Sequence, residues 1–331
     1  MKAMVWTKYG SPEGFELQEV EQPVPKPDEI LIKIHATTVT AGDCEMRRLQ
    51  LPLGLSFPFR LYAGLLRPKR IRILGQELAG EVIEVGEQVT NYRVGDQVFG
   101  TTGFQFGAYA EYICLLAEPD DAQGVLAEKP TNLTYAEAAA LPTAGLEALH
   151  YMRTAKVGPG KYVLIIGGGG SIGTISIQLA KHYGADVTAV DSTEKLDLMR
   201  SLGADQVIDY TTEDYRNRGG IYDLVIDVVG KHSIATRLKL LKPDGIYFLA
   251  FPRPFHMILS FWTALTSKKQ VKIEASSQSK EDLIALKAFV EQGKLKPVID
   301  CSFPLEQIPK AHTYAESGEK KGNISITMDS G

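Results

Sequence analysis

The sequence has few cysteines, almost no excess charge and no long apolar run. Only three of its 331 residues are cysteines, namely Cys44, Cys114 and Cys301, and they lie far apart. Such a set does not form a disulfide framework, so a reducing, cytoplasmic location is expected. The net charge of −4 does not favour nucleic acid as a partner. No stretch reaches the roughly 18–20 apolar residues of a membrane span, so membrane contact is not expected.

Two kinds of pattern divide the chain. Residues up to about position 120 are β-rich, with clear alternation at Ile30–Ala36. From Lys161 onward strands and helices alternate, beginning with the unbroken apolar run Tyr162–Ile166, which is typical of a strand buried on both faces. This alternation predicts a parallel, doubly wound sheet in an α/β fold. After about Val271 the chain returns to a strand, a helix and a last strand at Asn323–Met328.

Apolar periodicity also predicts the main helices. The first of them is expected to bend at Pro142, because proline removes a backbone hydrogen bond. The predicted helices are Tyr135–Arg153, Ile172–Tyr183, Thr193–Leu202, Lys280–Gln292 and Pro309–Ser317.

One stretch is strongly basic. Between Met46 and Gln76 there is no acid, and Leu, Phe and Tyr lie among seven bases: Arg47, Arg48, Arg60, Arg67, Lys69, Arg70 and Arg72. The favoured interpretation is a long loop that covers the substrate and keeps its bases solvated. The alternative is a surface that docks on anionic lipid or on a partner.

The most specific motif follows the strand at Tyr162–Ile166. Gly168, Gly170 and Gly173 fit G-x-G-x-x-G at the start of a helix. Asp191 ends the next strand, where such motifs carry an acid. The glycines permit a tight turn and a close approach of a pyrophosphate, and the helix N-terminus binds the phosphates. The sequence therefore predicts a dinucleotide-binding site.

Further motifs extend over nearly the whole chain. They are GQELAGEVIEVGE at Gly75–Glu87, VGDQVFG at Val94–Gly100, GAYAEY at Gly107–Tyr112, LPTAGLEAL at Leu141–Leu149, RSLGADQVIDY at Arg200–Tyr210 and GNISIT at Gly322–Thr327. In these motifs the chain resembles the medium-chain dehydrogenases/reductases, specifically the zinc-free quinone oxidoreductase (zeta-crystallin-like) branch. The resemblance implies a Rossmann doubly wound parallel sheet, at residues 128–265, inserted into a GroES-like β-rich catalytic domain formed by residues 1–127 and 266–331. It also implies a homodimer paired through Ile246–Ala250 or Val271–Ala275.

The zinc ligands of related enzymes are replaced here. Thr40 stands where they carry a cysteine and Gln76 where they carry a histidine. No cysteine lies between Tyr135 and Tyr151, and the four-cysteine structural lobe is missing. Since zinc needs three or four convergent N, S or O ligands, the residues predict a protein without zinc.

The lack of a metal restricts the chemistry. Zinc lowers the pKa of bound water by about nine units, equivalent to about 12 kcal/mol, and nothing in the sequence replaces it. The predicted function is therefore NAD(P)H-dependent hydride transfer to a substrate that is already electrophilic, a quinone or an α,β-unsaturated carbonyl. Two alternatives stay open, a zinc-dependent alcohol dehydrogenase and a non-catalytic nucleotide-binding redox sensor.

The resemblance also implies the site residues. Thr40 and Asp43 are expected near the nicotinamide, although both are common turn residues. The predicted cofactor-binding residues are Gly167, Gly168, Gly170, Ser171, Ile172, Gly173, Asp191, Ser192, Lys195, Tyr210, Val229, Phe248 and Ala250. The aromatic residues proposed for an apolar substrate pocket are Phe57, Phe59, Tyr62, Phe104 and Tyr109.

Three residues complicate this assignment. Glu45 and Glu147 stand where several relatives have a tyrosine and a threonine, which leaves the proton donor open. Cys44 is expected to be a buried thiol, because no histidine partner is evident in the sequence.

The choice of cofactor rests on residues that disagree. Asp191 favours NADH, because a carboxylate accepts hydrogen bonds from ribose hydroxyls and repels a 2′-phosphate by about 1–4 kcal/mol at about 4 Å. Ser192, Lys195 and Tyr210 stand where NADPH-using relatives hold that phosphate. The sequence leans slightly to NADH, with use of both cofactors.

Overall fold

The computed structural model describes residues 1–51, 54–119, 122–230, 233–250, 256, 260, 263, 267–273, 276 and 278–328. The chain forms two compact units. The first contains Met1–Leu51, Leu55–Leu146 and Ser277–Gly331, and the second contains Pro52–Gly54 and Glu147–Ser276. Both ends of the chain thus contribute to the first unit.

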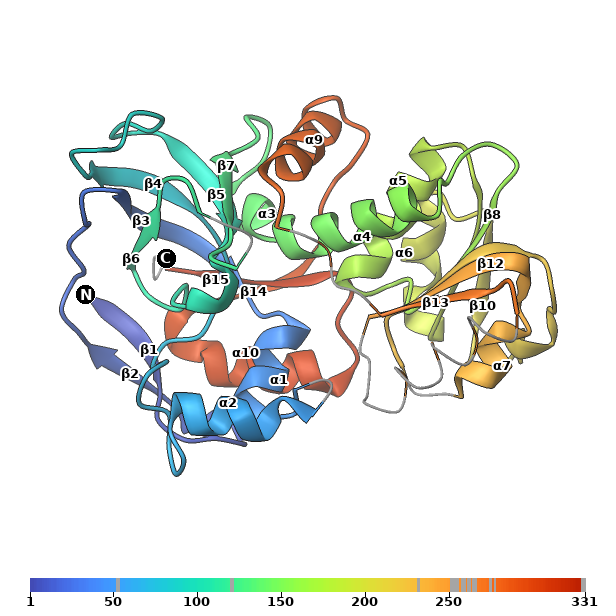
Figure 1. Ribbon diagram of the computed structural model, residues 1–331, viewed down its shortest axis with the longest axis horizontal. Helices are drawn as coiled ribbons and strands as arrows, with labels where there is room; N and C mark the ends of the chain where they lie inside the picture. Colours follow the sequence, from blue (N-terminus) through green and yellow to red (C-terminus); the bar gives the residue numbers. More distant parts are fainter. Residues whose placement is uncertain are drawn as a thin grey trace. The chain divides into compact units, whose positions relative to one another are not determined.

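The first unit is built on a seven-stranded sheet (Figure 1). Its strands lie in the order β14 (Ile299–Pro304), β15 (Asn323–Thr327), β3 (Glu29–Thr38), β4 (Glu77–Val85), β5 (Gln97–Thr101) and β7 (Val125–Glu128), with β6 (Tyr112–Leu116) paired to β3. A two-stranded sheet of β1 (Lys2–Trp6) and β2 (Phe15–Glu19) lies beside it, linked through a bridge between Ala3 and Ala110. Apart from the parallel pair β14–β15, the strands pair antiparallel. Because β15 pairs with β3, one sheet contains residues from both ends of the chain.

Helices accompany these strands. They are α1 (Ala41–Arg48), α2 (Ser56–Ala63), α3 (Tyr135–Ala139), α4 (Pro142–Thr154), α9 (Lys280–Glu291) and α10 (Ile308–Ser317). The predicted helix Tyr135–Arg153 is in fact two helices, and α4 starts at Pro142. Proline lacks an N–H and has a preset φ, so it is better suited to the first position of a helix than to the middle of one. The bend expected at Pro142 is therefore a complete break.

The second unit contains a six-stranded parallel sheet. Its order is β10 (Gln206–Asp209), β9 (Asp186–Asp191), β8 (Tyr162–Ile166), β11 (Tyr222–Asp227), β12 (Leu241–Leu249) and β13 (Gln270–Lys272). Its helices are α5 (Ser171–His182), α6 (Leu196–Ser201) and α7 (Ile234–Leu238). The chain runs outward from β8 to β10, returns to β11 and then runs the other way. Because such crossovers are right-handed, α5 and α6 cover one face and α7 the other, which confirms the doubly wound parallel sheet (Figure 1).

Short 3-10 helices complete the described elements. They are η1 (Pro12–Gly14), η3 (Gly103–Gln105), η4 (Thr193–Lys195), η5 (Tyr215–Asn217) and η6 (Leu305–Gln307). The predicted helix Thr193–Leu202 thus consists of η4 followed by α6. In the part of the chain that the structure describes, no helix is long and apolar enough to cross a membrane.

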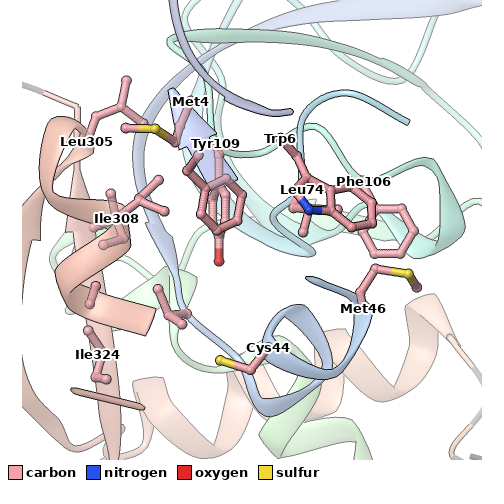
Figure 2. Packing of buried hydrophobic residues seen from close by; sticks show 14 of the residues in the cluster. Met4, Trp6, Cys44, Met46, Leu74, Phe106, Tyr109, Leu305, Ile308 and Ile324 are labelled. Atoms are coloured by element: carbon pink, nitrogen blue, oxygen red, sulfur yellow. The ribbon is translucent and has the colours of Figure 1, made fainter. Parts of the chain in front are cut away.

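A hydrophobic cluster fills the first unit on the side of α1 and α10 (Figure 2). Met4, Leu305 and Ile308 surround the ring of Tyr109, and Trp6 packs nearby. The helices α1 and α10, far apart in sequence, contact each other here. This packing holds the start of α1 in place, and the start of α1 carries Thr40 and Asp43.

Candidate functional site

A glycine turn joins β8 to α5 in the second unit. Gly167 has φ +87°, in the left-handed region that favours glycine, and the N–H groups of Gly167 and Gly168 donate to Val190 O at 2.9 and 3.1 Å. A Cβ on Gly173 would overlap the carbonyl oxygen of Gly167 and lie 2.7 Å from Gly168 Cα. A Cβ on Gly170 would have only one neighbour, at 3.5 Å. Gly173 therefore permits close packing, while Gly170 leaves space open above the turn.

The start of α5 suits an anion. Gly170 is its N-cap residue and has no side chain to accept a hydrogen bond from the first turn. The first N–H groups of an α-helix lack partners within the helix, and the helix dipole adds partial positive charge there. Donors, positive potential and the open space at Gly170 together fit a pyrophosphate.

Asp191, at the end of β9, is held by the same turn. Its Oδ2 accepts a hydrogen bond from Gly169 N and its Oδ1 one from Ser192 N, each at 2.9 Å. Lys195 Nζ lies 3.5 Å from Oδ1, and Asp191 is only 7% exposed. The carboxylate is thus oriented by backbone donors and partly neutralised by a base.

Two other predicted cofactor residues lie at the same edge of the sheet. Tyr210 is 56% exposed, and its N–H donates to Asp191 O at 3.2 Å. A Cβ on Gly167 would lie 3.0 Å from Cγ2 of Val229, which is partly exposed. Both side chains therefore border the glycine turn.

Phe248 and Ala250, the last two predicted cofactor residues, are placed differently. Phe248 is 1% exposed, and its ring centroid lies 4.5 Å from that of Tyr151. Ala250 N donates to Asp227 O at 3.1 Å. Phe248 thus packs in the interior of the second unit, and a cofactor contact at either residue stays a prediction.

Thr40 and Asp43 form a capping box at the start of α1 in the first unit. Asp43 N donates to Thr40 Oγ1, and Thr40 N donates to Asp43 Oδ2, both at 3.0 Å. The Thr40 hydroxyl also lies 2.7 Å from Oδ2, and Gly75 N donates to Oδ1 at 3.2 Å. The capping role considered from the sequence is therefore present, and the hydroxyl of Thr40 is held in one position.

Burial changes the acidity of Asp43. The residue is fully buried, and desolvation raises its pKa to about 6, although hydrogen bonds from Thr40, Gly75 and Tyr109 oppose this rise. The carboxyl group thus titrates near neutral pH.

Glu77 and Gln76 complete this polar group, which we call the Thr40 cluster (Thr40, Asp43, Gln76 and Glu77). Glu77 is buried; its Oε1 accepts from Thr143 N at 2.7 Å, and its Oε2 accepts from the Thr38 hydroxyl. Burial raises the pKa of Glu77 to about 7. A Cβ on Gly42 would lie 2.6 Å from Gln76 Oε1 and 3.5 Å from Thr40 Oγ1. The Gln76 amide therefore lies against the first turn of α1, beside Thr40.

The Thr40 cluster does not fit a zinc ion. Its hydroxyl and amide groups are poor zinc ligands, and both oxygens of Glu77 already accept hydrogen bonds. The described residues include no group of three or more His, Cys, Asp or Glu side chains that could hold a metal. The sequence prediction did not include Glu77, although its place directly after Gln76 in the former zinc motif was a signal for it.

Cys44 has a histidine neighbour that the sequence did not reveal. Its Sγ lies 3.3 Å from Nδ1 of His312, a residue of α10, and both side chains are buried. Burial raises the pKa of Cys44 to about 12 and lowers that of His312 to about 3. Both groups are therefore neutral, and Cys44 is a buried thiol rather than an activated nucleophile.

The five aromatic residues predicted for a substrate pocket are brought together only in part, since the rings of Phe59 and Tyr62 lie 6.4 Å apart. Phe57, Tyr62 and Phe104 are exposed, by 65%, 55% and 73%. Phe59 packs against the hydrophobic cluster of Figure 2, and Tyr109 is fully buried inside it, with its hydroxyl 3.1 Å from His312 Nε2. A single pocket lined by all five rings is not seen, and the residues that contact the substrate stay a prediction.

The two glutamates considered for the proton donor also differ. Glu45, on α1, is half-buried, and burial raises its pKa to about 7, opposed by the charge of Arg48. Oε1 of Glu147 accepts from both the N–H and the hydroxyl of Ser276 at 3.2 Å. Glu45 therefore titrates near neutral pH.

Comparison with known proteins places the chain in a family. Residues 26–120 match the alcohol dehydrogenase GroES-like domain, and residues 202–325 match a family described as zinc-binding dehydrogenase. The chain is 34% identical over 338 residues to 2-methylene-furan-3-one reductase of Solanum lycopersicum, covering 98% of this chain and 79% of that protein. It is 32% identical, with the same coverage, to the chloroplastic NADPH-dependent alkenal/one oxidoreductase of Arabidopsis thaliana.

A solved structure agrees with these matches. The quinone oxidoreductase from Coxiella burnetii superposes with a TM-score of 0.87 at 30% identity, covering 99% of both chains. The predicted combination of a GroES-like domain with a Rossmann sheet is thereby confirmed. The chain therefore belongs to the medium-chain dehydrogenase/reductase family, in its branch of quinone and alkenal oxidoreductases.

Proposed function

We propose that the protein is an NAD(P)H-dependent reductase that transfers hydride to a quinone or an α,β-unsaturated carbonyl without a metal. The observation that carries this proposal is the Thr40 cluster, in which a hydroxyl and an amide replace the zinc ligands of related dehydrogenases. The relatives support the substrate class, since they are named as reductases of a methylene-furanone, of alkenals and enones, and of quinones.

The bound nicotinamide supplies the hydride. In our proposal, residues 128–265 form the nucleotide-binding domain, where the first-turn N–H groups of α5 hold the pyrophosphate and Asp191 accepts hydrogen bonds from the ribose. Gly170 keeps the space for the phosphates free of side-chain atoms. This arrangement needs only the backbone and one carboxylate.

The Thr40 cluster would then orient the reacting groups. Asp43 holds the Thr40 hydroxyl in place, and the Gln76 amide, whose Oε1 lies against the first turn of α1, would offer its N–H groups to the substrate. Such neutral donors stabilise a developing enolate or quinol oxygen far less than a Lewis acid does. The substrate must therefore be electrophilic before it binds.

We propose Glu45 as the proton donor, because it lies on α1, the helix whose start carries Thr40 and Asp43, and burial raises its pKa to about 7. A carboxylic acid with a pKa near the working pH is well suited to general acid catalysis. Activity should fall as the pH rises above about 7 and Glu45 ionises. Glu45→Gln should lower kcat and remove this part of the pH profile, whereas an unchanged profile would assign the proton to solvent.

The function is tested with a panel of quinones, enones and simple alcohols, following NAD(P)H absorbance. We expect turnover of the quinones and enones and poor oxidation of ethanol or benzyl alcohol. Comparable rates with alcohols would contradict the proposal. Tight cofactor binding without turnover of any substrate would instead favour the redox-sensor alternative.

Zinc is the specific alternative, because one matching family is described as zinc-binding. We propose that the protein contains no stoichiometric zinc, since Thr40 and Gln76 occupy two ligand positions. Elemental analysis of protein purified without chelator measures this directly. About one zinc per chain, with activity lost on its removal, would overturn the proposal.

We further propose a slight preference for NADH, with NADPH also used. The Asp191 carboxylate disfavours a 2′-phosphate, but Lys195 at 3.5 Å offsets much of that repulsion. The measurement is the ratio of kcat/KM for the two cofactors, in the wild type and in Asp191→Asn. We expect the substitution to shift the ratio toward NADPH. A native NADPH preference above about tenfold that the substitution leaves unchanged would show that Asp191 does not face the ribose.

We also propose a homodimer that pairs through β13. This three-residue strand ends the six-stranded sheet, and an edge strand offers unpaired backbone groups to a second copy. Light scattering at micromolar concentration should give twice the chain mass of 36.3 kDa. A value near the chain mass would rule out the dimer.

A further inference from the structure

The segment from residue 54 to 72 exposes an unusual amount of apolar surface. It contains α2 and the turn that follows it, in the first unit and on the side away from the sheet (Figure 1). Six of its large apolar side chains are more than half exposed: Leu55 (51%), Phe57 (65%), Leu61 (57%), Tyr62 (55%), Leu65 (56%) and Leu66 (86%). So many exposed apolar residues in one short segment mark an interaction site.

The opposite face of α2 is anchored. Ala63 is buried and Phe59, four residues before it, packs against the cluster of Figure 2. The Tyr9 hydroxyl donates to Gly64 O at 2.6 Å. Phe57 and Leu61 are also four residues apart and lie together on the outer face. The helix thus has one face fixed to the protein and one apolar face without cover.

Bases surround this outer face. Arg60, Arg67, Lys69, Arg70 and Arg72 are all exposed. Their described contacts are with rings and neutral groups: the Arg70 guanidinium lies 4.6 Å from the Tyr62 ring, and Arg60 Nε donates to Leu65 O at 2.7 Å. The other two bases of the basic stretch between Met46 and Gln76 are different, since Arg47 and Arg48 of α1 pair with Glu316 and are structural.

We infer that this surface, consisting of the six apolar residues and the five exposed bases, docks on the headgroup region of an anionic phospholipid bilayer. The apolar side chains would enter the boundary between headgroups and acyl chains, while the arginine and lysine groups contact lipid phosphates. This departs from the expectation that the protein makes no membrane contact, which rested on the lack of a spanning segment. The inference does not depend on the proposed reductase activity.

Charge favours a bilayer over a second copy of the chain as the partner of this surface. In a twofold-symmetric contact the same patch meets itself, so five bases would face five bases without an acid. The chain as a whole carries a net charge of −4, so the positive charge of this segment is local. An anionic bilayer offers negative charge to pair with the five bases. It also offers an apolar layer to cover the six apolar side chains.

The test is co-sedimentation of the full chain with vesicles of phosphatidylcholine alone and of phosphatidylcholine mixed with phosphatidylglycerol. We expect binding to the anionic vesicles only, weakened by added salt. The double variants Leu65→Ser/Leu66→Ser and Arg67→Gln/Lys69→Gln should each reduce the bound fraction by roughly tenfold or more. The matched control variants are Val24→Ser, at another exposed apolar residue, and Lys294→Gln, at another exposed base; both should bind like the wild type.

Circular dichroism and thermal melting check that the variants remain folded. Lack of binding to anionic vesicles by the wild type would overturn the inference. Equal binding by the Leu65/Leu66 variant would overturn it too. If the Leu65/Leu66 variant instead raised KM for a short, water-soluble enone and the wild type bound no vesicles, the segment would be the substrate-covering loop.

Discussion

The glycine turn of the second unit and the Thr40 cluster of the first unit hold buried carboxylates in different ways. Asp191 receives two backbone hydrogen bonds and has Lys195 beside it. Asp43 and Glu77 receive hydrogen bonds from hydroxyl and N–H groups, and burial raises the pKa of each, to about 6 and about 7. One carboxylate thus has a base 3.5 Å away, whereas the other site holds two buried acids that titrate near neutral pH.

The largest expected effect comes from breaking the close packing of the glycine turn. Gly173→Ala forces a Cβ onto Gly167 O and Gly168, and such overpacking costs about 1–3 kcal/mol or more. We expect a loss of about 3 kcal/mol of unfolding free energy and at least a tenfold loss of NAD(P)H affinity. Chemical denaturation and cofactor titration measure the two quantities.

Gly170→Ala is the matched control for this change. Its Cβ meets only one atom, at 3.5 Å, so the free energy of unfolding should change little. Cofactor affinity should still fall, because the methyl group occupies the space proposed for the phosphates. Equal destabilisation by both alanines would mean that the turn is not packed as described.

In the first unit, Asp43→Ala should have the next largest effect. It removes the capping box of α1 and leaves the buried N–H of Gly75 without its acceptor. Together these losses amount to about 2–3 kcal/mol of unfolding free energy. Asp43→Asn, which keeps an acceptor oxygen, should lose less. Urea denaturation of both variants compares them, and an alanine variant as stable as the wild type would contradict the role of the cap.

The raised pKa of Glu77 predicts how stability depends on pH. Between its ordinary value of 4.5 and the folded value of about 7, the folded protein binds a proton that the unfolded chain has lost. Its contribution is therefore present at low pH and is lost as the pH rises through about 7. The wild type should lose on the order of 2 kcal/mol relative to Glu77→Gln between about pH 5 and pH 7. Parallel stability curves for the two proteins would show that Glu77 is ionised throughout.

The smallest expected effect tests the base beside Asp191. Lys195→Gln removes the positive charge but keeps part of the side chain that packs against Gly169. The carboxylate then repels a 2′-phosphate without compensation, so kcat/KM for NADPH should fall severalfold and that for NADH much less. Lys195→Arg is the control that keeps the charge. If the glutamine variant lowered kcat/KM equally for both cofactors, Lys195 would only support the turn.

Local patterns predicted the second unit better than the first. The strands of the parallel sheet were predicted, because its central strands contain a short apolar stretch, such as Val163–Ile166 of β8, that is buried on both faces. In the first unit the strands Ile30–Ala36, Glu77–Gly86, Gln97–Phe99 and Ala108–Leu116 were predicted, whereas β1, β2, β7 and β14 were missed, as were α1 and α2. The helix α1 is short and mostly polar, with Gly42, Asp43 and two arginines, so its capping box and its contact with α10 help to stabilise it.

The sequence by itself predicted the glycine turn, because the glycines and Asp191 lie within 25 residues of each other and the turn depends largely on the backbone. It also determined which residue types stand at Thr40 and Gln76, the two positions where related enzymes carry zinc ligands. Only the tertiary structure brought Glu77 to Thr38 and Thr143, placed His312 against Cys44, and left Phe57 and Tyr62 exposed. These outcomes depend on strand pairing and helix packing between segments up to 268 residues apart. Local propensity carries no information about such distant partners, because burial is decided by what packs on a side chain.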